Sequence, residues 1–398
     1  MFTFNGKNVV LGITGGIAAY KSCEITRSLI KNKANVQVVM TKNATKFVTP
    51  LTLQTLSGNK VGSDLFDLTS ESEIGHIKIA DEADLIIVAP ATASFIGKLA
   101  SGIADSLLST VILASKAPVI LCPAMNVNMY SNSIVRENIS ILIKHGFNII
   151  EPEEGDLACG WEGKGRLPEI NNLLLQVEKV LTVQDFKQDN ILITAGATRE
   201  HIDPVRFISN PSTGKMGYAM AEASWLRGAS ATLISGHSEL SEPYGVKTIK
   251  VENAYDMYME AHNNFNENNI IIKCAAVSDF TPKTNSNNKI KKNGTGMNLK
   301  LEKTDDILQS LGNIKTNEIL VGFAAETDNL IQNSIKKLKN KNLDLIVSND
   351  INKEGAGFGT DTNIAYLIDK NENVEELPIM SKKELAHKIL DKINELRS

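Results

Sequence analysis

The strongest constraint on the fold is an alternation of short Val/Ile/Leu runs with longer helical segments along almost the whole chain. Continuous apolar runs of this kind are typical of strands that are covered on both faces, as in a parallel sheet. The alternation therefore predicts a doubly wound α/β architecture. The predicted strands cover residues 8–15, 35–41, 84–92 and 117–125 in the first half, and 190–198, 231–236, 269–277, 318–326 and 343–350 in the second.

The pattern restarts after a polar stretch at residues 183–190, which we interpret as a linker. A chain of 398 residues is too long for one ordinary domain. We therefore expect two tandem α/β domains, residues 1–189 and residues 190–398. Residues 283–300 are polar, basic and short of apolar side chains, which indicates a mobile loop or a short hairpin.

Charge and cysteine content exclude several classes of protein. The net charge of −4 gives no global positive field that would attract nucleic acid or an anionic membrane. No apolar run reaches the ~18–20 residues of a membrane helix. The 4 cysteines are scattered and form no C-x-x-C pair, which argues against a zinc ribbon or a disulfide scaffold. We expect a cytoplasmic protein with neither nucleic acid nor membrane as a partner.

A glycine-rich turn joins the first predicted strand to the following helix. Gly15 and Gly16 would let backbone N–H groups approach an anion at the start of that helix. Thr14 stands where the second glycine of a dinucleotide motif would be, so the turn is not a G-x-G-x-x-G site. Thr41 and Thr92 lie at the ends of two other predicted strands and could add hydroxyl groups to the same cleft, since open α/β sheets bind ligands beyond the carboxyl ends of their strands. The alternative is a tight turn without a ligand.

Three other polar residues of the first half are candidates for chemistry. His76 follows a glycine at a predicted helix start, although a lone histidine is more often structural. Asn126 follows a buried strand, where asparagine is also a common turn former. Cys159 lies in a glycine-rich segment that we interpret as a flap, whereas Cys23 and Cys122 lie in helix and strand patterns that core packing explains.

In the second half, residues 203–217 are rich in groups that bind anions but do not form a P-loop. Ser209 occupies the position of the first glycine, and Lys215 is followed by methionine instead of serine or threonine. Asp279 follows a strand, where it could hold a ribose or a metal-bound phosphate, or could cap a helix. The lysines of residues 289–292, and the pair Lys337 and Lys341, fit either a phosphate clamp or a solvated surface.

Taken together, these motifs make the chain resemble the family of bifunctional coenzyme A biosynthesis flavoproteins, in which a phosphopantothenoylcysteine decarboxylase is fused to a phosphopantothenate–cysteine ligase. The resemblance covers essentially the whole chain. It rests on GITGGIAAYK (12–21), GHI (75–77), APATAS (89–94), PAMNVNMY (123–130), ACGWEGKGR (158–166), ITAGATRE (193–200), DPVRFISNPSTGKMG (203–217), KCAAVSD (273–279), KIKK (289–292), GFAAET (322–327) and KNLDLIVSND (341–350).

For the first half, the resemblance implies a three-layer, flavodoxin-like decarboxylase domain that binds FMN. The implied FMN contacts are Gly15, Gly16, Thr41, Thr92 and Ser109. His76 and Asn126 match residues that handle the substrate carboxylate. Cys159 matches the residue that donates a proton after loss of carbon dioxide.

For the second half, the resemblance implies a Rossmann-like ligase domain. It would use CTP to join phosphopantothenate to cysteine through an acyl-cytidylate. Asn210 and Lys289 match catalytic residues of that reaction. The implied CTP contacts are Ala275, Asp279, Lys289, Asp306, Ile307, Phe323, Lys337 and Lys341. A divalent cation, Mg²⁺ or Mn²⁺, would accompany the triphosphate through ligands that the sequence does not identify. The family also implies a homo-oligomer, with trimers of the flavin domain and dimers of the ligase domain.

Two other classes compete with this interpretation. A nicotinamide-dependent oxidoreductase would need the G-x-G-x-x-G motif that is missing here, and flavin absorbance would eliminate it. A non-catalytic flavoprotein subunit that binds and regulates a partner should lack the combination of Asn126 and Cys159, and both residues are present.

Overall fold

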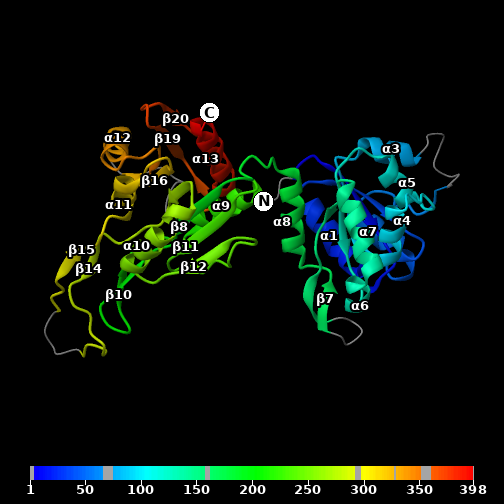
Figure 1. The fold of residues 1–398 in the computed structure, drawn as a ribbon, viewed down its shortest axis with the longest axis horizontal. Coiled ribbons are helices and arrows are strands. Elements are labelled where there is room, and N and C mark those ends of the chain that lie inside the picture. Colours follow the sequence, from blue (N-terminus) through cyan, green and yellow to red (C-terminus); the bar gives the residue numbers. More distant parts are fainter. Residues whose placement is uncertain are drawn as a thin grey trace. The chain divides into compact units, whose positions relative to one another are not determined.

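The computed structural model describes residues 4–65, 75–156, 162–291, 297–326, 329–350 and 360–397. The chain divides into two compact units, Met1–Leu181 and Thr182–Ser398. Both are α/β units built on largely parallel sheets, as the sequence predicts (Figure 1). The boundary after Leu181 lies before the expected boundary at residue 189. Among the described residues, no helix is both long and apolar enough to cross a membrane.

The first unit contains a parallel sheet of 5 strands in the order β2-β1-β3-β4-β5. The strands are β1 (Asn8–Ile13), β2 (Asn35–Met40), β3 (Leu85–Ala91), β4 (Val119–Pro123) and β5 (Asn148–Ile149). The four predicted strands of this half correspond to the first four. The sequence analysis did not predict β5, which has only 2 residues.

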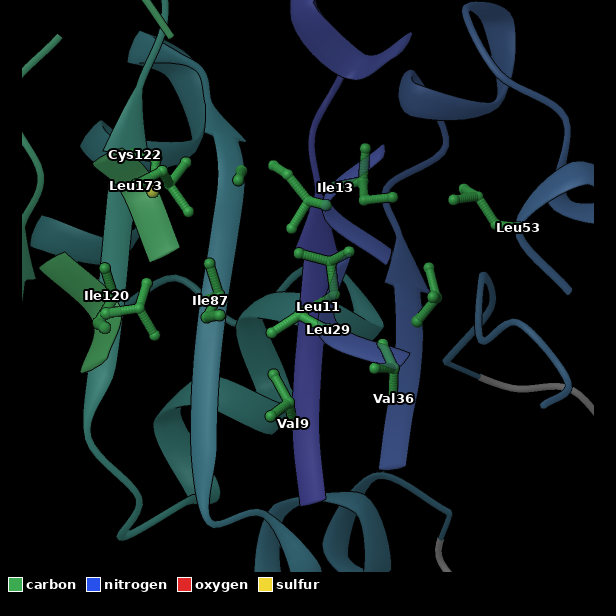
Figure 2. Close-up of a cluster of buried hydrophobic side chains, with 14 of the residues drawn as sticks. Val9, Leu11, Ile13, Leu29, Val36, Leu53, Ile87, Ile120, Cys122 and Leu173 are labelled. Carbon is green, nitrogen blue, oxygen red and sulfur yellow. The ribbon is translucent and has the colours of Figure 1, made fainter. Parts of the chain in front are cut away.

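Helices cover both faces of this sheet, because successive strand residues point to opposite sides. Val9, Leu11 and Ile13 pack against one layer of helices, and Val10 packs against the other. Figure 2 shows the first cluster, where Leu29 and Leu53 meet side chains of β1 and β2. The first layer comprises α1 (Lys21–Lys31), α2 (Pro50–Ser57) and α8 (Ile170–Leu181), and the second comprises α3 (Gly75–Glu82), α4 (Ala93–Ala100), α5 (Leu107–Ala114), α6 (Val127–Ser131) and α7 (Ser133–Lys144).

An antiparallel hairpin of β6 (Glu153–Asp156) and β7 (Glu162–Arg166) lies outside the main sheet of the first unit. It packs beside α6 because glycines on β7 allow close contact. A Cβ at Gly165 would lie 2.2 Å from the carbonyl oxygen of Met125, and a Cβ at Gly163 would lie 2.8 Å from a methyl group of Val127. The Met125 amide also donates to the Gly165 carbonyl at 3.0 Å. The hairpin is therefore docked through its backbone.

The second unit contains a sheet of 8 strands in the order β12-β11-β8-β13-β16-β17-β19-β20. The first six run parallel to one another, whereas β19 is antiparallel to β17 and β20 is antiparallel to β19. The strands are β8 (Asn190–Ala195), β11 (Ser230–Ser235), β12 (Lys247–Lys250), β13 (Ile270–Lys273), β16 (Ile319–Glu326), β17 (Leu345–Asp350), β19 (Ala365–Asp369) and β20 (Val374–Glu376). The five predicted strands are β8, β11, β13, β16 and β17.

Helices α9 (Lys215–Leu226) and α13 (Lys382–Arg397) cover one face of this sheet. Helices α10 (Ala254–Asn263), α11 (Ile307–Ile314) and α12 (Leu330–Asn340) cover the other. Three short strand pairs lie outside the sheet: β9 (Arg199–His201) with β10 (Phe207–Ser209), β14 (Phe280–Pro282) with β15 (Leu301–Lys303), and β18 (Thr362–Asn363) with β21 (Met380–Ser381). The predicted loop at residues 283–300 thus connects β14 to β15.

The polar stretch interpreted as a linker belongs to the second unit. Phe186 is fully buried, and the guanidinium groups of Arg227 and Arg397 lie 4.9 and 4.6 Å from the centre of its ring. Arg227 binds the Asp185 carboxylate and also donates to Asp391 at 2.7 Å. Burial alone would raise the pKa of Asp185, but its hydrogen bonds and ion pair with Arg227 hold that pKa below its usual value. These contacts fix the start of the unit against α9 and α13.

Candidate functional site

One cavity of the first unit lies at the carboxyl ends of its strands, where open α/β sheets bind ligands. Its volume is about 760 Å³, within the range of small-molecule sites. Eight site residues are expected in the first half, and five of them line this cavity: Gly15, Gly16, Thr41, Thr92 and Asn126. Further lining residues that the sequence analysis did not propose include Lys21, Asn43, Lys98, Asp105, Ser106 and Arg166.

The glycine turn is held against the end of β3 by Thr14. Its hydroxyl group donates to the Pro90 carbonyl at 2.7 Å and accepts from the Thr92 amide at 3.0 Å. Thr14 is 1% exposed, so its role in this turn is structural. A Cβ at Gly15 would lie 2.4 Å from the Cβ of Asn43, which explains why this position has no side chain. The result is a narrow backbone cradle followed at once by helical turns at residues 17–20.

Ser109 lies outside the cavity lining. It is fully buried in α5 and exchanges hydrogen bonds with Ser106, which is the N-cap of that helix. The hydroxyl groups of the two serines are 2.9 Å apart. Ser106 lines the cavity, so the structure places Ser109 behind Ser106 instead of on the cavity surface. Because Ser106 is the N-cap, it is this serine that reaches the cavity. The sequence shows two serines three positions apart but does not show which of them faces the ligand.

Asn126 is the N-cap of α6, and its side-chain oxygen accepts from the Asn128 amide at 2.8 Å. This contact fixes the side chain at the cavity. His76 lies in the first turn of α3, is partly buried, and is not among the residues that line the cavity. Cys159 lies outside the described residues, between the two strands of the β6–β7 hairpin in sequence. Burial raises the pKa of the Cys122 thiol, which is consistent with a packing role.

A charged cluster connects the helix that follows Asn126 to the hairpin. The Tyr130 hydroxyl donates to Glu151 at 2.5 Å, and Lys164 on β7 binds the same carboxylate at 2.9 Å. Burial alone would raise the pKa of Glu151, but these contacts and Arg136 hold it below its usual value. The cluster therefore supports the backbone docking of β7 beside α6.

In the second unit, several predicted residues meet at the carboxyl edge of β13. The Asn210 side-chain amide donates to the carbonyl groups of Ala276 and Val277, at 3.3 and 3.1 Å. Asp279 follows this segment and is exposed. It immediately precedes β14, so the alternative that it caps a helix is wrong. Ala275 is buried, and its amide donates to the Thr194 hydroxyl group at 3.2 Å.

Asp306 and Lys341 form a second part of this edge. Asp306 is the N-cap of α11, where one oxygen accepts from the Gln309 amide at 3.0 Å. Its other oxygen lies 2.7 Å from the Lys341 ammonium group. Ile307 is buried directly after it. Lys337 lies on the exposed side of α12.

Phe323 is separated from these residues by the sheet. It is partly buried and packs against the core under α9 and α13, whereas Ala275 and Ile307 belong to the core under α10, α11 and α12. Lys289 is exposed in the segment between β14 and β15.

Lys273 is a residue of this region that the sequence analysis did not propose. Its ammonium group donates to the Ala275 carbonyl at 3.0 Å. Burial, reinforced by the charge of Lys341, lowers the pKa of Lys273 to about 8. The sequence does carry a clue, because Lys273 ends an otherwise all-isoleucine strand. Within the described ranges, no group of three or more His, Cys, Asp or Glu side chains gathers to hold a metal ion.

Comparisons with known proteins cover both units. The family described as "Flavoprotein" matches residues 3–182, and the family described as "DNA/pantothenate metabolism flavoprotein C-terminal domain" matches residues 186–396. A relative from Bacillus subtilis (strain 168), named "Coenzyme A biosynthesis bifunctional protein CoaBC", is 51% identical over 393 residues, which are 98% of this chain and 97% of the relative. A protein of the same name from Escherichia coli (strain K12) is 42% identical over 393 residues, with the same coverage of each chain.

Proposed function

This chain belongs to the family of bifunctional coenzyme A biosynthesis proteins, and we propose a division of labour between its two units on that basis. The chain is a flavoprotein enzyme that combines a phosphopantothenoylcysteine decarboxylase with a phosphopantothenate–cysteine ligase. Decarboxylation takes place in the unit that ends at Leu181, and ligation in the unit that begins at Thr182. The observation that carries this assignment is the cavity of the first unit, which joins a glycine cradle to Asn126.

The residues of this cavity fit FMN. The close approach of Gly15 to Asn43 leaves room for backbone N–H groups, but no side chain, at the start of a helix, which suits a phosphate. Thr41 and Thr92 supply hydroxyl groups beside it, and Ser109 supports the position of Ser106. When bound, FMN supplies a two-electron acceptor for the thiol-bearing carbon of the substrate. Oxidation at that carbon provides the electron sink without which loss of carbon dioxide would leave an unstabilised carbanion.

The chain's own residues have separate tasks in decarboxylation. Asn126 and His76 bind and orient the carboxylate that is lost. Cys159 donates a proton to the decarboxylated product as that product is reduced to phosphopantetheine. The support for Cys159 is its position in sequence between β6 and β7, since β7 is docked directly on the residues that flank Asn126.

Replacing Cys159 with serine should separate the two halves of this reaction. A thiol has a pKa of ~8.5, whereas an alcohol ionises far higher, so the variant retains a hydroxyl group but loses the acid. We expect it to release carbon dioxide, to leave the two electrons on the flavin, and to stall with a product two hydrogens lighter than phosphopantetheine. His76→Asn should instead fail before carbon dioxide is lost. Product masses and carbon dioxide release measure both outcomes, and normal phosphopantetheine at an undiminished rate from Cys159→Ser would contradict the role.

In the second unit, phosphopantothenate attacks CTP to give an acyl-cytidylate and pyrophosphate. Cysteine then displaces CMP. Asn210 holds the acyl-cytidylate, and Lys289 offsets negative charge on the phosphates. Ala275, Asp279, Asp306, Ile307, Phe323, Lys337 and Lys341 contact the nucleotide. Mg²⁺ or Mn²⁺ would accompany the triphosphate and offset its negative charge.

One assay tests the proposed function as a whole. The full chain is supplied with phosphopantothenate, cysteine, CTP and Mg²⁺, and products are identified by mass spectrometry. Phosphopantothenoylcysteine should appear first and be converted to phosphopantetheine. If neither product forms in a protein that carries flavin, the assignment of substrates fails. The proposed oligomer, trimeric through the first unit and dimeric through the second, is tested by its molar mass in solution.

The variant Lys289→Gln should impair ligation alone. Removing one preorganised group that stabilises charge costs about a hundred-fold in rate or more. FMN binding and decarboxylation should remain at the level of the unmodified chain, since Lys289 lies in the other unit. Lys283→Gln is the matched control, because it removes another exposed lysine from the same segment. Equal loss of ligation in both variants would show that only the overall charge of the segment matters.

A further inference from the structure

The segment that carries Lys289 is fixed to the turn before β10. The Ser286 amide donates to the Ile202 carbonyl at 3.0 Å. The Ile290 amide donates to the Asp203 carboxylate at 3.2 Å, and the Ile290 carbonyl accepts from the Arg206 side chain at 3.3 Å. Both backbone polar groups of the residue that follows Lys289 are therefore held by residues of this turn.

Asp203 uses its two carboxylate oxygens for different tasks. Oδ1 accepts from the backbone amides of Val205 and Arg206, at 2.8 and 2.9 Å, and so forms the turn itself. Oδ2 accepts from the Arg206 guanidinium group at 3.0 Å and from the Ile290 amide. Asp203 is 1% exposed. Burial alone would raise its pKa, but the three amides and the charge of Arg206 hold that pKa below its usual value, so the group is ionised at neutral pH.

The same turn also supports the rest of the proposed ligase site. It leads directly into β10, which Asn210 follows, and Asn210 is bonded to the carbonyl groups of Ala276 and Val277. Residues from three separate parts of the sequence are thus tied together around residues 203–210. Of these parts, the segment near Lys289 is held by Oδ2 of Asp203.

We propose that Asp203 is a positioning residue of the ligase site. Its Oδ2 atom fixes the backbone beside Lys289, so that the lysine side chain extends to the nucleotide phosphates from a fixed backbone position. The proposal rests on the proposed function of Lys289. Asp203 does not contact the nucleotide itself. It acts through Lys289 by limiting where the segment can lie, because a misplacement of about 1 Å can cost a hundred-fold in rate.

The variant Asp203→Asn separates this role from formation of the turn. The asparagine oxygen can still accept the amides of Val205 and Arg206. The side-chain nitrogen then replaces Oδ2, and two donors, the Ile290 amide and the Arg206 guanidinium group, face a third donor. Asp369→Asn is the matched control. Asp369 is also buried, and its Oδ1 accepts hydrogen bonds from the amides of Asn371 and Asn373, but it is the last residue of β19, before the turn to β20.

Hydrogen exchange on the full chain measures the anchor directly. In Asp203→Asn we expect the Ile290 amide to exchange roughly ten- to a hundred-fold faster, the size expected for loss of a hydrogen bond to a charged group. Asp369→Asn should leave that amide unchanged. If Ile290 exchanges at the same rate in Asp203→Asn as in the unmodified chain, the proposal is wrong.

A double-mutant cycle then tests whether Asp203 acts through Lys289. Asp203→Asn alone should lower kcat/KM for ligation by about tenfold or more, but should add less than about twofold to Lys289→Gln, because coupled residues are not additive. Full additivity would overturn the proposal. If Asp203→Asn does not fold, Ile290→Pro can replace it, because proline lacks the amide that donates to Asp203. This variant should show the same loss of kcat/KM for ligation. If Lys289→Gln ligates at an undiminished rate, both the function of Lys289 and the proposal for Asp203 are wrong. If Lys289→Gln is impaired but the Ile290 amide exchanges normally in Asp203→Asn, only the proposal for Asp203 is wrong.

Discussion

Gly15→Ala should yield a chain whose first unit binds little or no FMN, while ligation by the second unit continues. The new Cβ would lie 2.4 Å from the Cβ of Asn43 and 2.8 Å from its backbone carbon. Contacts this short are not tolerated, and a backbone atom cannot rotate aside as the end of a side chain can. The glycine turn or the segment after β2 must move, which displaces the N–H groups proposed to bind the phosphate.

The expected size of the effect is about a hundred-fold in FMN affinity and decarboxylation, since about 1 Å of misplacement can have this consequence. Visible absorbance of the purified protein measures bound flavin. Gly97→Ala is the matched control, because Gly97 lies outside the cavity lining and its Cβ would meet only the side-chain nitrogen of Asn138 at 3.5 Å. If the two variants retain the same flavin content, the cradle does not bind the phosphate in the way proposed.

Phe186→Ala should destabilise the second unit by about 3–5 kcal/mol, which is typical for removal of a buried aromatic side chain. Phe186 is fully buried, and two guanidinium groups lie 4.9 and 4.6 Å from the centre of its ring, so the variant also loses these contacts. A loss of this size is comparable with the whole stability of many domains. Ligation should therefore fail at moderate temperature, well before decarboxylation does.

Denaturant unfolding followed separately for flavin release and for ligation measures this difference. The transition of the first unit should stay where it is, because Phe186 packs within the unit that begins at Thr182. Val183→Ala provides the control, since that side chain is 74% exposed. An equal shift of both transitions would mean that the residue stabilises the first unit as well.

The sequence predicted the parallel strands well because they are buried on both faces and therefore consist of continuous Val, Ile and Leu. It did not predict the parallel strands β5, with 2 residues, and β12, which is partly exposed, the antiparallel strands β19 and β20, or the β6–β7 hairpin, which has few apolar residues. The polar segment near residue 186 shows the limit of such patterns. Its single phenylalanine is a core residue of the second unit, and only the contacts with Arg227 and Arg397 reveal this.

The residues of the candidate sites could be predicted where their position is determined by the end of a strand. Thr41, Thr92 and Asn126 follow β2, β3 and β4 of one parallel sheet, so they lie at the same edge of that sheet. Residues placed by helix caps or loop contacts were harder to predict. Ser106 instead of Ser109 reaches the cavity, and Asp203 meets Ile290 across 87 positions of sequence. Neither relation produces a local pattern.

The docking of β7 through Gly163 and Gly165 has a consequence for how this unit can diverge. Strand β7 is held by close backbone contact and by the hydrogen bond from the Met125 amide to the Gly165 carbonyl, so its attachment depends chiefly on these two glycines. Natural variation or directed evolution should therefore retain Gly163 and Gly165, whatever else changes on this strand. A library built at residues 157–161 should in addition keep Cys159, because it is the proposed proton donor.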